Sequence, residues 1–81
     1  MNRVEYHGIN LDTLQKLADT KNISVITPET LAEFGLTNKK DLIKILGRGE
    51  LKAKLEVTAH RFSEKAKSAI EAQGGVASLI Q

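Results

Sequence analysis

The 81-residue sequence contains no cysteine and no tryptophan, a single proline and only three aromatic residues. Without cysteine, neither disulfide bonds nor thiolate metal sites can reinforce the modest core that a chain of this length buries. No apolar run approaches the roughly 18 residues that a membrane span requires, and no signal-peptide pattern opens the chain. These absences predict a cytoplasmic protein with no membrane partner.

The sequence also lacks any pattern that is typical of catalysis. His7 and His60 are far apart and have no metal-ligand spacing. The segment 47–49 is a lone Gly-Arg-Gly without the Gly-Lys-Ser/Thr that completes a phosphate-binding loop. Glu50 and Glu56 fall in a turn and on a polar strand face, where no burial would raise a carboxylate pKa for acid catalysis. We therefore expect no enzyme, no cofactor, no metal and no small-molecule substrate.

Charge is distributed unevenly along the chain, although its net value is only +2. Residues 1–35 hold three basic and five acidic residues, a net charge of −2, whereas residues 36–81 hold nine basic and five acidic residues, a net charge of +4. A basic half produces a local positive potential that the average over the chain conceals. The pattern fits either a surface for a polyanion or a solvated surface of mixed charge.

The first half of the sequence predicts two helices and a strand. Residues 1–9 form a short alternating piece, which is either a frayed edge strand or a disordered lead-in. Asn10 is typical of an N-cap, and leucines at helical spacing predict a helix over 11–19. A β-branched run predicts a strand over 23–26. The Thr-Pro-Glu start and the terminal glycine predict a second helix within 27–35.

The second half of the sequence predicts three strands and a third helix. Residues 42–46 are nearly all apolar, which predicts a strand covered on both faces. A glycine-containing turn at 47–50 leads to residues 53–59, whose strict alternation predicts a half-buried strand. A serine cap and two glycines bound a helix within 63–74, and 76–80 reads as a last strand. We therefore predict one layered α/β domain over residues 1–81, with three short helices and with residues 1–8 frayed if they are not a strand.

The basic residues of the second half are expected to form a stripe along the turn, the polar strand face and the start of the third helix. Lysines in a first helical turn, where acids are preferred, suggest a nearby anion. Because Phe34 and Phe62 occupy core positions, base stacking is disfavoured, and phosphate and shape recognition of folded RNA is expected. Lys44 has a rival interpretation, with its stem packed over the core. The candidate RNA-binding residues are Lys44, Arg48, Lys52, Lys54, His60, Arg61, Lys65 and Lys67.

A long gapped pattern runs through this half and extends upstream. The matching positions are residues 44–47, Gly49, Leu51, Leu55, Val57, Phe62, Ser63, Ala66, Ile70 and Gly74, together with residues 9–14 and 26–31. In type and spacing this pattern resembles the large-subunit ribosomal protein fifteen family, in its bacterial form, from about residue 8 onward.

The resemblance implies an irregular superhelix of strand-strand-helix turns and a structural, non-catalytic role in the large ribosomal subunit. It also implies large-subunit rRNA and neighbouring ribosomal proteins as partners, and a location in the cytoplasmic ribosome. Members of this family carry a basic N-terminal extension that is missing before residue 8. We therefore expect a C-terminal globular domain, natural or engineered. The alternative is an isolated protein-interaction or scaffold module without independent RNA binding.

Overall fold

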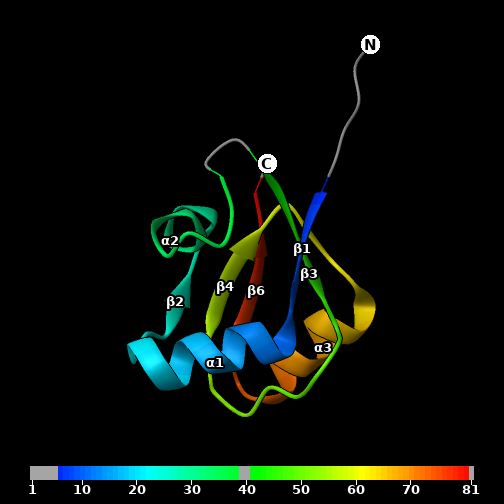
Figure 1. Ribbon diagram of the computed structural model, residues 1–81. Coiled ribbons are helices and arrows are strands. Elements are labelled where there is room, and N and C mark those ends of the chain that lie inside the picture. Colours follow the sequence, from blue (N-terminus) through cyan, green and yellow to red (C-terminus); the bar gives the residue numbers. More distant parts are fainter. Residues whose placement is uncertain (1–5, 39–40, 81) are drawn as a thin grey trace.

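The computed structural model describes residues 6–38 and 41–80 (Figure 1). Within these ranges helices and strands alternate, and the predicted α/β class with three short helices is confirmed. The elements are β1 (Tyr6–Asn10), α1 (Leu11–Lys21), β2 (Val25–Ile26), α2 (Pro28–Glu33), β3 (Leu42–Leu46), β4 (Glu56–Ala59), β5 (Arg61–Phe62), α3 (Glu64–Ala72) and β6 (Val76–Leu79). Residues 1–5, 39–40 and 81 lie outside the described residues.

The strands form two parallel three-stranded sheets. The first sheet has the order β1-β3-β5 and the second has the order β2-β4-β6. Every neighbouring pair in a sheet is therefore joined by a crossover, as parallel pairing requires. Figure 1 shows β4 and β6 side by side at the centre, α1 running across the lower end, and α2 and α3 on opposite sides.

Two helices begin as their sequences predict. The Thr27 hydroxyl oxygen accepts a hydrogen bond from the backbone N–H of Thr30 at 3.2 Å, and Pro28 occupies the first helical position of α2. The Ser63 hydroxyl oxygen accepts from the N–H of Ala66 at 3.2 Å and caps α3. Both caps satisfy amides that have no partner within the helix.

The first helix differs from its prediction at both ends. Asn10 is the N-cap, but its side chain makes no capping hydrogen bond, and this residue is also the last of β1 with extended backbone geometry. The helix continues two residues beyond the predicted Asp19, and Asn22 then adopts the left-handed conformation with φ 53°. Asparagine tolerates this conformation better than most residues do.

Three strand predictions need correction. β3 is covered on only one face, because Ile43 and Ile45 are buried whereas Lys44 is exposed between two half-buried leucines. The predicted strand over 53–59 begins only at Glu56, although the alternation of buried and exposed residues starts earlier. The two-residue strand β5 was not predicted, because its pairing with β3 is visible only in the fold.

The core lies between the two sheets and receives residues from every helix. It contains leucines of α1 and α2, the inward side chains of the central strands, and two residues of α3. The buried residues are Ile9, Leu11, Leu14, Leu17, Ile26, Leu31, Ile43, Ile45, Leu51, Leu55, Val57, Ala59, Ala66 and Ile70. No helix in the described part of the chain is long and apolar enough to span a membrane.

Candidate nucleic-acid interface

Seven of the eight predicted contact residues have exposed side chains, and His60 is half-buried. Among the described residues, no carboxylate lies within 4.0 Å of any of these seven cations. Within the described ranges, these charges therefore have no ion-pair partner. The exposed cations are Lys44, Arg48, Lys52, Lys54, Arg61, Lys65 and Lys67.

Three of these cations lie around the point where the 47–50 turn passes the start of α3, and we call Arg48, Lys52 and Lys65 the basic corner. Lys65 packs directly over Gly47, since a Cβ atom on this glycine would lie only 2.6 Å from the Cβ atom of Lys65. Lys52 and Lys65 line the same shallow depression, together with Glu50. The corner therefore joins cations that are distant in the sequence. Two carboxylates also lie there, Glu50 in the same depression and Asp12 over Gly49, where a built Cβ atom would lie 2.7 Å from the Cβ atom of Asp12.

The loop that carries Lys52 is fastened to α1. The side-chain oxygen Oε1 of Gln15 accepts hydrogen bonds from the backbone amides of Lys52, at 2.8 Å, and of Ala53, at 3.0 Å. The backbone amide of Asp12 donates to the carbonyl oxygen of Arg48 at 3.4 Å. These contacts hold the backbone of an irregular segment, so the lysine and the arginine project from a fixed position.

Lys44 and Arg61 are neighbours on adjacent strands, because the β3–β5 register aligns their Cα atoms. The Nε atom of Arg61 donates a hydrogen bond to the Tyr6 hydroxyl at 3.2 Å, and the guanidinium carbon lies 5.9 Å from the centre of the Tyr6 ring. This hydrogen bond raises the pKa of Arg61 above its ordinary value. Tyr6 is not among the predicted contact residues, although its alternation with Gly8 is the signal that places it on a strand face.

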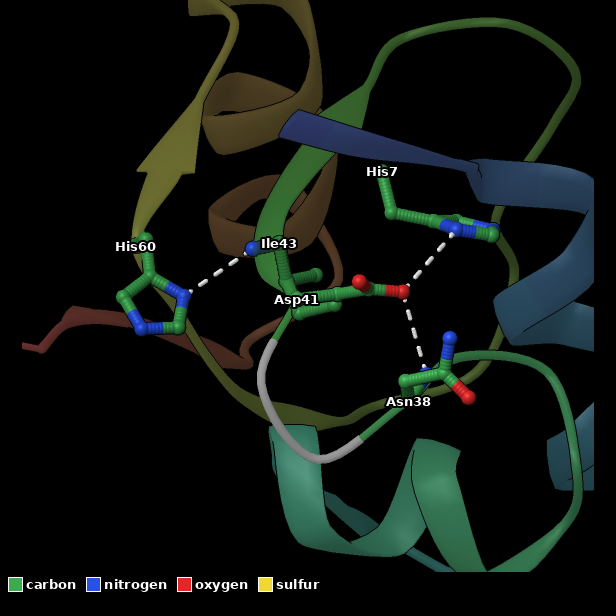
Figure 2. A network of polar contacts seen from close by, with 5 residues as sticks. All are labelled: His7, Asn38, Asp41, Ile43 and His60. Carbon is green, nitrogen blue, oxygen red and sulfur yellow. Dashed lines mark hydrogen bonds and ion pairs between the residues drawn. The ribbon is translucent and has the colours of Figure 1, made fainter. Parts of the chain in front are cut away.

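His60 and Lys67 line a groove together with Arg61, Phe62 and Leu79. The ring of His60 already has a structural partner, because its Nδ1 atom accepts a hydrogen bond from the backbone amide of Ile43 at 2.9 Å (Figure 2). Only the Nε2 side of the ring can therefore donate to an external group. The assignment of His60 to RNA contact stays a prediction limited to that atom.

The arrangement of the cations differs from the predicted stripe. The turn and the start of α3 adjoin at the carboxyl end of β3, instead of lying at opposite ends of one strand. Lys54 lies outside β4, beside Gly74, and lines a depression with Glu56. β4 covers only Glu56–Ala59, so Lys54 and His60 flank this strand instead of lying within it.

No group of three or more metal-ligating side chains occurs in the part of the chain that the structure describes. Five of the predicted contact residues lie along the first sheet. The basic corner is at the carboxyl end of β3, Lys44 lies in the middle of that strand, and the Arg61 guanidinium reaches Tyr6, which the register aligns with the first residue of β3. Fold and site thus define a small parallel α/β domain with a cationic surface. The chain belongs to the ribosomal protein family that includes the 50S proteins L15 and L18e and their 60S counterpart, and the family model matches residues 8–78.

Several relatives are named Large ribosomal subunit protein uL15. The protein from Amoebophilus asiaticus is 56% identical over 79 residues, which cover 98% of this chain and 52% of the relative. The protein from Flavobacterium johnsoniae is 56% identical over 84 residues, covering 99% and 54%, and that from Bacteroides thetaiotaomicron is 51% identical over 75 residues, covering 93% and 51%. The chain therefore spans about half the length of these relatives, and the predicted family is confirmed.

Proposed function

We propose that this chain is a structural, non-catalytic part of the large ribosomal subunit and that it binds large-subunit rRNA through its basic surface. Membership of a ribosomal protein family supports a place in the ribosome. The names of the relatives support a place in its large subunit. Neighbouring ribosomal proteins are the second class of partner, and the proposed location is the ribosome in the cytoplasm. The chain uses no cofactor or small-molecule substrate in this role.

The observation that carries the RNA proposal is the series of exposed cations along the first sheet, from the carboxyl end of β3 to the Tyr6 end. The basic corner adjoins the end of β3, and Lys44 and Arg61 are aligned on the strands beside it. Lysine and arginine side chains at such positions neutralise phosphates and release the counterions condensed on them. Several exposed cations held by one sheet and its adjoining turn can therefore contact more than one phosphate of an RNA backbone.

The proposal is tested by measuring the affinity of the chain for an in vitro transcript of large-subunit rRNA at several salt concentrations. If about four phosphates are neutralised, the logarithm of the affinity falls against the logarithm of the salt concentration with a slope of roughly −3. A flat salt response, or no binding near about 50 mM salt, would contradict independent RNA binding by this chain.

Matched variants distinguish the effect of the basic surface on RNA affinity from the effect of net charge. The triple variant Arg48→Gln, Lys52→Gln and Lys65→Gln removes the basic corner, and each lost phosphate contact reduces the steepness of the salt dependence by about one. The control is Lys16→Gln with Lys21→Gln, which removes exposed cations of α1 that lie outside the predicted set. An equal effect per removed charge in the two variants would contradict a defined binding surface.

A protein-interaction or scaffold role is the second candidate, and one observation favours it. Val25 and Val76 flank Glu56 in the register of the second sheet, and these valines are 48% and 49% exposed. Apolar residues on an exposed sheet face are typical of a protein contact. On this alternative, reversing the charge of Arg48, Lys52 and Arg61 leaves the affinity for every protein partner unchanged.

A further inference from the structure

The outer face of the first sheet carries an aromatic ring beside two cations. Parallel register aligns Gly8 of β1 with Lys44 of β3, and Lys44 with Arg61 of β5, so these three positions point to the same side. Because side chains alternate between the two faces of a strand, residues two positions away on the same strand also point to this side. The described residues of this outer face are Tyr6, Gly8, Asn10, Leu42, Lys44, Leu46 and Arg61.

The ring and the guanidinium group on this face are held together across the central strand. β1 and β5 are both neighbours of β3 and do not pair with each other, yet Arg61 donates to the Tyr6 hydroxyl at 3.2 Å. The side chain of Arg61 therefore spans β3 to reach Tyr6. Gly8 has no side chain, and Leu46 fills the space next to it, since a Cβ atom there would lie 2.8 Å from a Leu46 methyl carbon.

The chemistry of the outer face is unusual for a surface that only meets water. Tyr6 is 39% exposed, and Arg61 and Lys44 are exposed beside it. The described positions of this face include no acidic residue, so the two positive charges have no counterion within it. A solvated sheet face does not require an arginine held against an exposed aromatic ring, whereas a ligand that is both flat and anionic matches both features.

We infer that the outer face around Tyr6, Lys44 and Arg61 holds one unpaired nucleotide of an RNA chain. The base stacks on the Tyr6 ring and the Arg61 guanidinium plane, and the phosphate contacts the ammonium group of Lys44. This inference rests on the proposed function and extends it from phosphate contacts to a base contact. The nucleotide must be unpaired, because bases within an RNA helix are already stacked on their neighbours and present only their edges.

The alternative occupant is an acidic protein segment, and the composition of the face favours the nucleotide. Carboxylates would pair with Lys44 and Arg61 but would leave the aromatic ring exposed. Stacking on a ring is independent of base identity, because every base has a π-face. The face therefore favours an unpaired residue of any type, and neighbouring contacts fix its position in the RNA.

Crosslinking tests the inference directly. The chain is bound to the large-subunit rRNA transcript, irradiated at short ultraviolet wavelength and digested with ribonuclease and trypsin. We expect mass spectrometry to find a nucleotide attached to Tyr6, within the tryptic peptide of residues 4–16. Crosslinks that occur only at other residues would overturn the stacking site.

Substitutions of Tyr6 give the second measurement. Tyr6→Thr removes the ring and keeps a residue with high strand propensity, and we expect the affinity for the transcript to fall about 5- to 150-fold. Tyr6→Phe is the comparison, because it keeps the ring for stacking and removes the hydroxyl that accepts from Arg61; we expect it to lose less affinity than Tyr6→Thr. Circular dichroism confirms that each variant folds.

The outcomes separate this inference from the proposed function. If the wild-type chain binds the transcript and Tyr6→Thr binds equally well, the stacking site is wrong and the phosphate contacts stand. If Tyr6→Thr keeps its RNA affinity but loses affinity for a ribosomal protein, the face contacts protein, which also overturns the inference. If the wild-type chain does not bind the transcript even at low salt, both proposals fail.

Discussion

His60 and Ile43 exchange two hydrogen bonds, although they are 17 residues apart. The backbone amide of His60 donates to the carbonyl oxygen of Ile43 at 3.0 Å, and the amide of Ile43 donates to the Nδ1 atom of the His60 ring at 2.9 Å (Figure 2). His60 is the only residue between β4 and β5, where the chain passes from the second sheet to the first. The two hydrogen bonds therefore connect β3, the central strand of the first sheet, to the residue at which the chain leaves the second sheet.

Replacing His60 tests the contribution of this ring. His60→Ala leaves the partly buried amide of Ile43 without an acceptor, and we expect the free energy of unfolding to fall by about 1–3 kcal/mol. His60→Asn is the matched control, because its side-chain oxygen can accept the same hydrogen bond and should recover part of the loss. Urea denaturation of both variants measures the difference. Equal stabilities for His60→Ala and the wild type would show that the hydrogen bond contributes nothing.

Gly75 is the glycine with the least space for a side chain. A Cβ atom built there would meet the carbonyl oxygen of Leu55, and the carbonyl oxygen of Ile70 lies 3.1 Å away. Both neighbours are backbone atoms, which cannot rotate aside. Because the backbone amides of Gly75 and Val76 donate to these same two carbonyl groups, a side chain would also disturb the connection between α3 and β6.

We expect Gly75→Ala to destabilise the chain by at least about 2 kcal/mol, on the scale of other overpacking changes. Gly74→Ala is the comparison, because Gly74 has a positive φ of 80° but no atom closer than 3.9 Å to a built Cβ. Its cost is about 1–2 kcal/mol from backbone conformation alone. Thermal denaturation distinguishes the two variants, and a larger loss for Gly74→Ala would contradict the crowding at Gly75.

Local signals in the sequence were sufficient to predict most of the fold. The Thr-Pro-Glu start of α2, the serine cap of α3 and the alternation around Val57 all act through residues a few positions apart. The strand β5 is only two residues long and exists because it pairs with β3, so no local pattern reveals it. The prediction that β3 is covered on both faces was wrong for a related reason. The composition of a strand does not say whether a helix packs on each of its faces.

The candidate site could be predicted as a list of cations and not as an arrangement. Lys65 lies over Gly47 because α3 starts beside the end of β3, and this proximity depends on the crossover between the sheets. The role of His60 was hidden because its partner is a backbone amide on a distant strand. Tyr6 stands out only when the register places Arg61 on the same face of the sheet.

Core truncation should have an effect that follows burial. Leu55 is 1% exposed, and Leu55→Ala is expected to cost about 2–5 kcal/mol. Phe62 is only partly buried against the core, so Phe62→Ala should cost less than Leu55→Ala per removed carbon atom. Leu79 is 62% exposed, and Leu79→Ala serves as the surface control with a change within about 0.5 kcal/mol. Chemical denaturation checks the order, and a Leu55→Ala midpoint equal to that of the wild type would contradict the core assignment.

Gln15 should control how firmly the basic corner is held. Its Oε1 atom accepts from the amides of Lys52 and Ala53, while its side-chain nitrogen donates to Asp19 at 3.0 Å, one turn further along α1. Gln15→Ala removes the acceptor from both amides. Each hydrogen bond contributes about 0.5–1.5 kcal/mol, so the loop opens more often even if the rest of the fold is unchanged.

Amide hydrogen exchange measured by NMR tests this role residue by residue. In Gln15→Ala we expect the amides of Lys52 and Ala53 to exchange about 5- to 12-fold faster, which corresponds to about 1–1.5 kcal/mol per bond. The amides of Val57 and Ala59 in β4 should keep their protection, because the core beneath them is intact. The control Lys16→Ala changes the next residue of the same helix, whose side chain is exposed, and should leave both loop amides unchanged. Equal acceleration in the two variants would mean that α1 itself has loosened and that Gln15 has no specific hold on the loop.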